Sequence, residues 1–196
     1  MISRILTPTE WEKLKANLNP YYQIICEAML HTGLRTDSEF WRFVENPQWY
    51  HRGKITIPYI NSLQQARTIP LSIKGREAVE ILIAFTRTNN KRKEKNTVRD
   101  ALRRAASGDG RTTARIDGRL KKVNRSPVFS TDGVNANMLR KTFITWLVYC
   151  YPEKKYEILI AMGIDEENFG QYIGKKTFEK KEFIKMRVYL EGWVKR

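Results

Sequence analysis

Arginine and tyrosine side chains in three separated segments of this 196-residue chain have the types that phosphodiester chemistry requires. These segments carry Arg35, Arg140 and Tyr172. A guanidinium group stays protonated and offers a planar fork of donors that matches phosphate oxygens. A tyrosine phenol can form a covalent phosphotyrosyl link and later be displaced from it. If the fold brings the three side chains together, they can transfer a phosphodiester without ATP, because the covalent link conserves the bond energy.

The sequences around these residues resemble the motifs of tyrosine recombinases, and most closely those of archaeal virus and plasmid integrases. Residues 31–35 read HTGLR and are followed by Glu39, and residues 139–147 read LRKTFITWL. Residues 170–173 read GQYI, and residues 67–71 read RTIPL, which is similar to the closing strand of the family's sheet. The pieces occur in the family's order and cover nearly the whole chain.

The resemblance implies the catalytic-domain fold of a tyrosine recombinase and an enzyme that cleaves and rejoins DNA at specific sites. In such an enzyme Tyr172 would attack the scissile phosphate and form a 3′-phosphotyrosine intermediate. Arg35 and Arg140 would stabilise the charge on the non-bridging oxygens. Removing one preorganised donor of this kind typically costs about 10²–10³ in rate. The resemblance implies neither a metal nor any other cofactor.

Several positions depart from the family's pattern. Asn137 lies three residues before Arg140, where the family usually has His or Lys, and Ile164 lies where His or Trp is usual. Residues 61–66, the expected hairpin connection, contain no lysine. A positioned proton donor or acceptor is worth roughly 10²–10⁴ in rate, so we expect slow cleavage with phosphate binding retained. The auxiliary candidates are Lys54, Asn137, Lys141 and Lys175.

The candidate site residues also have purely structural explanations. Arg35 could pair with Asp37 or Glu39 at the end of a helix. Arg140 lies among apolar residues of a helix, where an arginine needs a partner and could form a buried salt bridge. Tyr172 could be a tyrosine that only packs at a surface. These alternatives stay open at the level of sequence.

The chain is strongly basic, with a formal net charge of +15 and a pI of about 9.9. Between Lys91 and Arg125 it has 13 basic and 4 acidic residues, interleaved with glycines. Such a field attracts polyanions, and binding to repeated phosphates releases counterions. We therefore expect residues 89–125 to be mobile without a partner and to clamp double-stranded DNA, rather than to form only a solvated face. The DNA-contacting candidates are Lys91, Arg92, Lys93, Arg99, Arg103, Arg104, Arg111, Arg115, Arg119, Lys121 and Lys122.

Other functions compete with recombination. A non-catalytic relative with a regulatory or accessory role would bind DNA without cleaving it. An RNA- or ribosome-associated basic protein would prefer structured RNA over duplex DNA. An anionic membrane surface would need a basic amphipathic helix, which residues 180–193 offer by composition. We favour double-stranded DNA, with a steep salt dependence that reflects about six or more neutralised phosphates.

Hydrophobic periodicity and capping signals predict a mainly α fold with one small antiparallel β-sheet (α+β). Thr7 and Glu10 form a capping box for the first helix, Gly33 ends the second, and Asp37 or Ser38 caps the third. Ser72 caps a later helix, in which the packing residues are Ile73, Val79, Leu82 and Ile83. The expected strands span residues 54–59 and 67–71. The other expected helices span about residues 20–31, 97–106, 134–150, 153–162, 166–172 and 180–193.

We expect residues 1–196 to form one catalytic-domain-like module, without the N-terminal core-binding domain that family members carry. Family members assemble as tetramers on DNA by exchanging a C-terminal segment, for which residues 178–196 are the candidate. In solution we expect a monomer or a weak dimer. No stretch approaches the roughly 20 apolar residues that span a bilayer, and no signal peptide opens the chain. We therefore expect a protein of the host cytoplasm that does not bind membranes.

Four further residues have expected structural roles. Tyr189 is the alternative nucleophile, but its helical spacing with other apolar residues favours core packing. Cys26 and Cys150 are expected to be buried free thiols, because two distant cysteines form neither a disulfide framework nor a zinc motif. His31 is expected to be a hydrogen-bonded histidine at a helix end.

Overall fold

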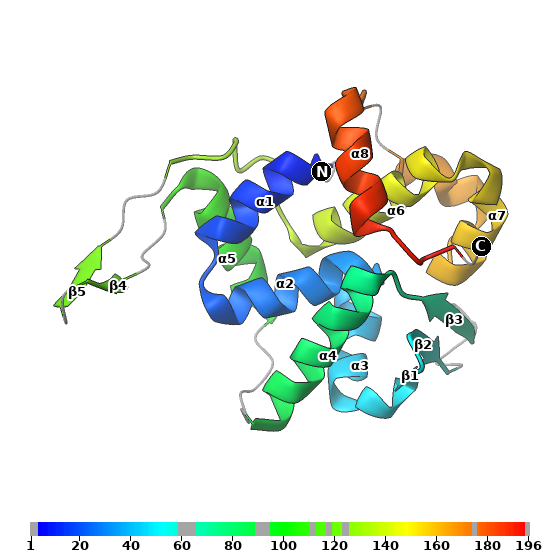
Figure 1. Ribbon diagram of the computed structural model, residues 1–196, viewed down its shortest axis with the longest axis horizontal. Coiled ribbons are helices and arrows are strands. Elements are labelled where there is room, and N and C mark those ends of the chain that lie inside the picture. The colour runs from blue at the N-terminus through cyan, green and yellow to red at the C-terminus, as the bar shows by residue number, and fades with distance from the viewer. Residues whose placement is uncertain are drawn as a thin grey trace.

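The computed structural model describes residues 4–58, 66–88, 95–109, 113–116, 119–122, 126–173 and 176–194. Within these residues the chain is mainly helical, with a three-stranded antiparallel sheet in the order β1-β2-β3 and a separate β4-β5 hairpin (Figure 1). The expected combination of helices with a small antiparallel sheet is confirmed. The α-helices are α1 (Pro8–Asn17), α2 (Pro20–Thr32), α3 (Trp41–Glu45), α4 (Ile73–Thr88), α5 (Lys95–Ser107), α6 (Ala136–Cys150), α7 (Lys155–Met162) and α8 (Lys180–Tyr189). The strands are β1 (Tyr50–His51), β2 (Lys54–Ile57), β3 (Arg67–Pro70), β4 (Thr113–Ile116) and β5 (Arg119–Lys122).

Helices α2 and α6 pack against each other in the core, and α4 covers α2 while α7 and α8 contact α6 (Figure 1). Gly33 ends α2 in the left-handed conformation, with φ 60°. A Cβ atom at Gly33 would lie 2.8 Å from Met162 Sδ and 3.0 Å from Phe143. Only glycine therefore suits both the backbone turn and the close approach of α6 and α7, and this turn places Arg35 at the edge of the core.

The sheet shows the alternation that its sequence predicts. Strand β2 is antiparallel to β3, with Ile55 opposite Ile69 and Ile57 opposite Arg67. All four of these side chains are buried, so Arg67 lies on the apolar face of the sheet. Strand β1 was not expected, and it extends the sheet by pairing with β2.

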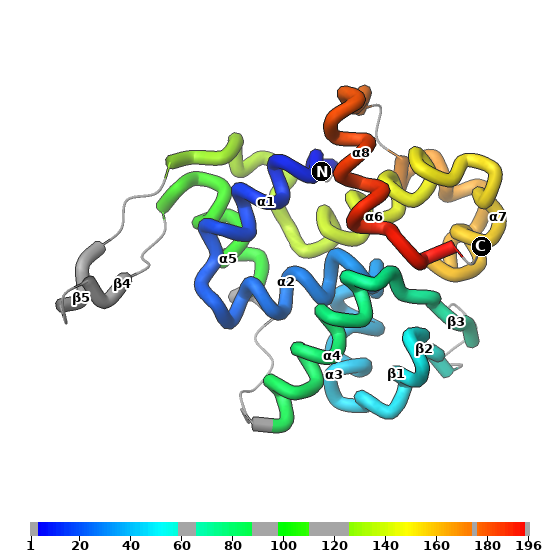
Figure 2. The backbone as a smooth tube through the Cα atoms, in the orientation of Figure 1, coloured from blue at the N-terminus to red at the C-terminus, as the bar shows by residue number. Residues whose placement is uncertain are grey.

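Helix α8 packs on its own chain, beside the N-terminal helix (Figure 2). Glu182 is buried and accepts a hydrogen bond from the backbone N–H of Thr9 at 3.1 Å. Lys185 donates to Glu12 at 2.7 Å, and Met186 and Tyr189 are buried. Exchange of residues 178–196 between subunits would require α8 to release these contacts. The burial of Tyr189 confirms that it is a packing residue.

Some expected elements differ from the structure. The segment after Arg35 begins at Thr36 as a π-helical turn, η1 (Thr36–Phe40), so neither Asp37 nor Ser38 occupies the cap position. The amide groups of Glu39 and Phe40 both donate to Arg35 O, which produces this wider turn. Ile73 was expected to pack in the core, but it is 46% exposed. The segment expected as a loop after α5 contains the β4-β5 hairpin.

Other expectations at the element level are confirmed. The capping box of α1 is present, and Ser72 Oγ accepts the Gly75 N–H at 3.0 Å at the start of α4. Cys26 and Cys150 are buried free thiols. In the part of the chain that the structure describes, no helix combines the length and the apolar character that crossing a membrane requires.

His31 is fully buried between two aromatic rings. Its ring lies 5.7 Å from that of Tyr189 in a stacked arrangement and 6.4 Å from that of Phe143. Neither ring nitrogen of His31 has a hydrogen-bond partner among the described residues. The prediction that His31 is hydrogen-bonded is therefore wrong. Burial, and then the charges of Lys74 and Lys15, lower the pKa of His31 to about 3.

Replacing His31 with phenylalanine is expected to make the protein less sensitive to acid. The folded pKa lies below the unfolded value of 6.5, so the unfolded state binds the extra proton, and stability is lost as pH falls below 6.5. One histidine of this kind removes up to about 1.4 kcal/mol per pH unit across this window. Urea unfolding at several pH values between 3 and 7 would measure the slope of the unfolding free energy against pH. The exposed His51 is the control, and equal slopes for wild type, His31→Phe and His51→Phe would contradict the prediction.

Candidate active site

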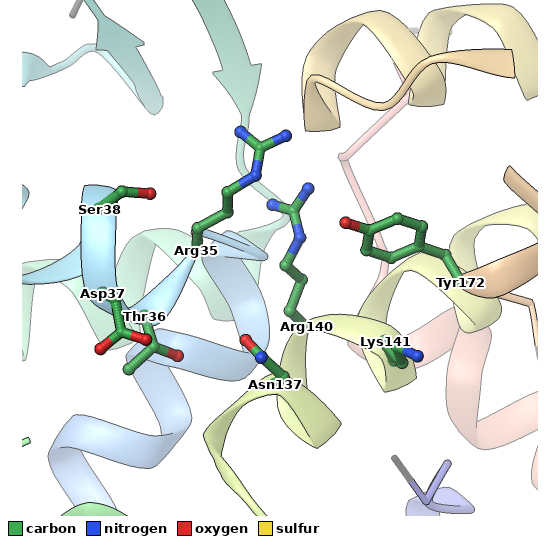
Figure 3. Close-up of a pocket in the computed structure, with 8 residues that line it drawn as sticks. All are labelled: Arg35, Thr36, Asp37, Ser38, Asn137, Arg140, Lys141 and Tyr172. Carbon is green, nitrogen blue, oxygen red and sulfur yellow. The ribbon is translucent and has the colours of Figure 1, made fainter. Parts of the chain in front are cut away.

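Three distant segments of the chain meet at one pocket with a volume of about 280 Å³ (Figure 3). The turn after α2 contributes Arg35, the first half of α6 contributes Arg140, and Tyr172 follows the 3-10 helix η4 (Glu166–Gln171). Among the described residues, the lining consists of Arg35, Thr36, Asp37, Ser38, Asn137, Arg140, Lys141 and Tyr172. The structure thus brings together all three side chains whose chemistry the sequence singled out.

Tyr172 points toward the two guanidinium groups (Figure 3). Its ring centroid lies 5.4 Å from the guanidinium carbon of Arg140. The backbone carbonyl of Tyr172 accepts a hydrogen bond from the hydroxyl of Thr145 at 3.1 Å, which ties η4 to α6. The phenol is therefore held beside the arginines by both its ring and its backbone.

A buried carboxylate connects the arginines. Glu39 is 0% exposed, and its Oε1 accepts hydrogen bonds from Arg35 Nη1 and from Arg67 Nη2, each at 2.7 Å. Its Oε2 accepts the Arg35 N–H at 2.9 Å and lies 4.0 Å from Arg140 Nη1. Burial alone would raise the pKa of Glu39, but the charge and hydrogen bond of Arg67, the backbone hydrogen bond from Arg35 and the charge of Arg140 hold it below its usual value. Glu39 is therefore ionised at neutral pH.

Arg140 is 3% exposed, yet it retains a free donor. Its Nη1 donates to Gly33 O and its Nη2 donates to Met162 O at 2.7 Å. Its Nε is buried and has no partner among the described residues. A buried N–H without a hydrogen-bond partner destabilises the folded protein, unless a ligand accepts its hydrogen bond. Burial, and then repulsion from Arg35, lower the pKa of Arg140 to about 10, so it keeps its charge at neutral pH.

The pocket can bind an anion, and it leaves excess positive charge to do so. Arg35, Arg67 and Arg140 contribute three guanidinium groups around the carboxylate of Glu39, and Lys141 and Asp37 on the lining add one charge of each sign. The side chain of Arg35 is 28% exposed, so it can reach a ligand that enters from solvent. The described residues contain no group of three or more His, Cys, Asp or Glu side chains that could hold a metal ion.

The auxiliary candidates separate into three groups. Asn137 and Lys141 line the pocket, and Lys141 Nζ lies 5.8 Å from the ring centroid of Tyr172. Lys54 was expected near the site, but it lines another hollow with Thr68, Ile160 and other residues, because its strand turns it away from the arginines. Lys175 lies outside the described residues.

The basic DNA-contacting candidates are described only in part. Arg99, Arg103 and Arg104 are exposed on α5, which packs on α1. Four candidates lie on the β4-β5 hairpin, whose side chains are not described: Arg115, Arg119, Lys121 and Lys122. The candidates outside the described residues are Lys91, Arg92, Lys93 and Arg111.

Sequence reasoning missed Arg67 as a residue that contacts the site. It treated the RTIPL segment only as a strand marker, although alternation along β3 places Arg67 on the same face as the buried Ile69. A charged side chain on an apolar strand face needs a buried partner, and this was the signal available in the sequence.

No protein-family model, curated protein or solved structure matches this chain.

Proposed function

We propose that this chain is a tyrosine recombinase catalytic domain, with the fold of that family, which cleaves and rejoins DNA through a 3′-phosphotyrosine intermediate. One observation carries the proposal: Arg35, Arg140 and Tyr172 line one pocket, and the buried Nε–H of Arg140 has no partner among the described residues. An anion with oxygens on several sides, such as a phosphodiester, satisfies that donor while remaining accessible to the phenol.

The proposed reaction conserves bonds and protons without a cofactor. The phenol oxygen of Tyr172 attacks the phosphorus in line, and the bond to the 5′ oxygen breaks as the new O–P bond forms. Arg35 and Arg140 stabilise the charge on the non-bridging oxygens. The phenol loses a proton and the 5′ oxygen gains one. A 5′-hydroxyl later attacks the phosphotyrosine and restores the DNA strand.

Proton transfer is the step of this mechanism that the pocket catalyses least. None of the described residues that line the pocket is a histidine, and the position three residues before Arg140 holds Asn137. Among the described residues of the lining, Lys141 and Asp37 can exchange protons, as can water. This predicts slow cleavage. It also favours a second candidate function, a DNA-binding relative that does not cleave.

The proposed partner is double-stranded DNA. The net charge of +15 and the exposed arginines of α5 provide the positive field that phosphates require. If the protein belongs to this family, it acts in the cytoplasm of a host cell. It would be a monomer or a weak dimer in solution and would assemble into tetramers on DNA.

A covalent-trapping experiment tests the proposal. Duplexes enriched from a randomised pool by binding would be nicked close to the cleaved phosphate, so that the short released strand diffuses away and the adduct accumulates. We expect a slow covalent adduct, with the phosphotyrosyl peptide mapped to Tyr172 by mass spectrometry. Tight duplex binding with no adduct under any condition would reject cleavage and support the non-catalytic relative. Stronger binding to structured RNA than to duplex DNA at fixed salt would reject both.

Removing the charges of α5 is expected to weaken DNA binding without slowing the reaction of bound DNA. In the variant Arg99→Gln/Arg103→Gln/Arg104→Gln, the slope of log affinity against log salt should fall by about three, one for each phosphate that is no longer neutralised. The adduct rate at saturating protein should stay at the wild-type value. The control removes three exposed charges from α8, at Lys180, Lys181 and Arg187. An equal decrease of slope in both variants would show that α5 makes no specific contribution.

A further inference from the structure

Three successive backbone carbonyls at the end of α7 each accept a hydrogen bond from a different arginine. The pairs are Arg67 Nε to Ala161 O at 3.0 Å, Arg140 Nη2 to Met162 O at 2.7 Å, and Arg35 Nη2 to Gly163 O. The last carbonyls of a helix have no partner within it, and they carry the negative end of its dipole. The end of α7 is therefore the common support of all three guanidinium groups.

The turn after α7 explains why these particular carbonyls are available. Gly163 adopts the left-handed conformation with φ 61°, and the N–H groups of Gly163 and Ile164 donate to Ile160 O and Leu159 O. This turn satisfies the two preceding carbonyls and leaves the next three for the arginines. A Cβ atom at Gly163 would lie 2.9 Å from the guanidinium carbon of Arg67, so glycine permits the close contact.

Arg67 differs from the other two arginines because it does not line the pocket. It is 8% exposed and extends inward from β3. Its Nη2 donates to Glu39, and Glu39 in turn holds both the backbone N–H and the guanidinium group of Arg35. Arg67 thus contacts both structures that orient the pocket arginines: the carboxylate and the end of α7.

We propose that Arg67 is a positioning residue of this site, which fixes Glu39 and the 161–163 turn so that Arg35 and Arg140 present their donors to a phosphodiester. The inference rests on the proposed function, because it assumes that the pocket binds a phosphodiester. Its physical basis is the fork of the guanidinium group, which bridges a carboxylate and a carbonyl at the same time. A lysine at this position has one ammonium group and does not reproduce both contacts in the same geometry.

Loss of Arg67 changes how the site responds to pH. Among the described residues, the charged groups that face Glu39 are Arg35 from the turn after α2, Arg67 from β3 and Arg140 from α6. Arg67 makes the largest contribution that lowers the pKa of Glu39. Without it, that pKa rises, and Glu39 takes up a proton at a higher pH. Protonated Glu39 holds Arg35 less firmly, so phosphodiester binding in the variant is lost earlier as pH falls.

The test uses dimethyl phosphate, which is a monoanion throughout the pH range, and ¹⁵N NMR of the arginine Nε–H groups. In the wild-type protein we expect dimethyl phosphate to shift the Arg140 Nε–H signal, with a Kd that does not change from neutral pH into mild acid. Arg67→Gln should weaken binding about tenfold at neutral pH and further as pH falls. Adding Glu39→Gln to Arg67→Gln should remove this extra loss in acid, because no carboxyl group remains to titrate.

Control variants distinguish a failure of the role proposed for Arg67 from a failure of the proposed function. Arg76 also donates its Nε to a carbonyl, Leu71 O at 3.3 Å, and Arg76→Gln should bind dimethyl phosphate as the wild type does. If Arg67→Gln does not fold, Arg67→Lys replaces it, with weaker binding expected but no added loss in acid. Wild-type affinity in whichever Arg67 variant folds would overturn the inference alone. Failure of the wild-type protein to bind dimethyl phosphate would overturn the proposed function and the inference together, whereas binding without a DNA adduct would overturn only cleavage.

Discussion

Replacing Tyr172 with phenylalanine is expected to abolish the covalent protein–DNA adduct and to leave DNA affinity unchanged. The substitution removes only the phenol oxygen, which points toward the arginines (Figure 3). The ring remains beside Arg140, and the backbone carbonyl of residue 172 still accepts the hydrogen bond from Thr145. The pocket should therefore bind a phosphodiester as before, but no nucleophile remains to form the covalent bond.

The measurement is the fraction of nicked duplex captured on the protein in a denaturing gel, beside a binding curve for the same duplex. Tyr189→Phe is the matched control, because its hydroxyl also faces a polar group, Glu12 Oε1 at 3.4 Å, but its ring belongs to the core. Tyr189→Phe should form the adduct at the wild-type rate. An adduct that survives in Tyr172→Phe would show that another residue is the nucleophile.

Local signals predicted the framework of the fold. The capping box at Thr7, the glycine that ends α2 and the serine that caps α4 each act within about four residues, so their physics is contained in the sequence. The alternation of Ile55 and Ile57 likewise predicted an inward face for β2. These features need no knowledge of distant segments, which is why the elements that position the pocket could be predicted.

The features that sequence reasoning missed leave no pattern in the sequence that is long enough to recognise. Strand β1 has two residues, too few to show alternation, and it exists because β2 lies beside it. The π-helical turn after Arg35 forms where Glu39 turns back to bind the backbone and side chain of Arg35. Ile73 follows the apolar period of α4, but it lies at the start of the helix against Gly192, where the core ends.

The sequence predicted which key residues line the pocket, but not the contacts that hold them in place. The motif resemblance selected Arg35, Arg140 and Tyr172, and the structure places them together. The salt-bridge alternatives considered for the two arginines also describe real contacts, because both approach Glu39. Structural pairing and anion binding are therefore not exclusive here, since Glu39 neutralises only part of the charge that three guanidinium groups supply.

Replacing Arg140 with lysine is expected to slow adduct formation by about 10²–10³ and to change duplex affinity by only a few-fold. Lysine keeps the charge, but it cannot bridge Gly33 O and Met162 O while also presenting a donor to the phosphate. DNA affinity depends on many phosphate contacts, so the removal of one donor affects it little. Arg140→Ala should be slower still, and less stable, because both carbonyls lose their partner.

Single-turnover adduct formation at saturating protein separates this effect from binding. Arg42, an exposed arginine on α3, is the control, and Arg42→Lys should react as the wild type does. The α5 variant and Arg140→Lys should then show opposite behaviour: the first loses affinity and salt dependence at a constant rate, and the second loses rate at a nearly constant salt dependence. If Arg140→Lys instead loses affinity without losing rate, the guanidinium group of Arg140 binds the ground state and the transition state equally, and it does not stabilise the transition state of cleavage selectively.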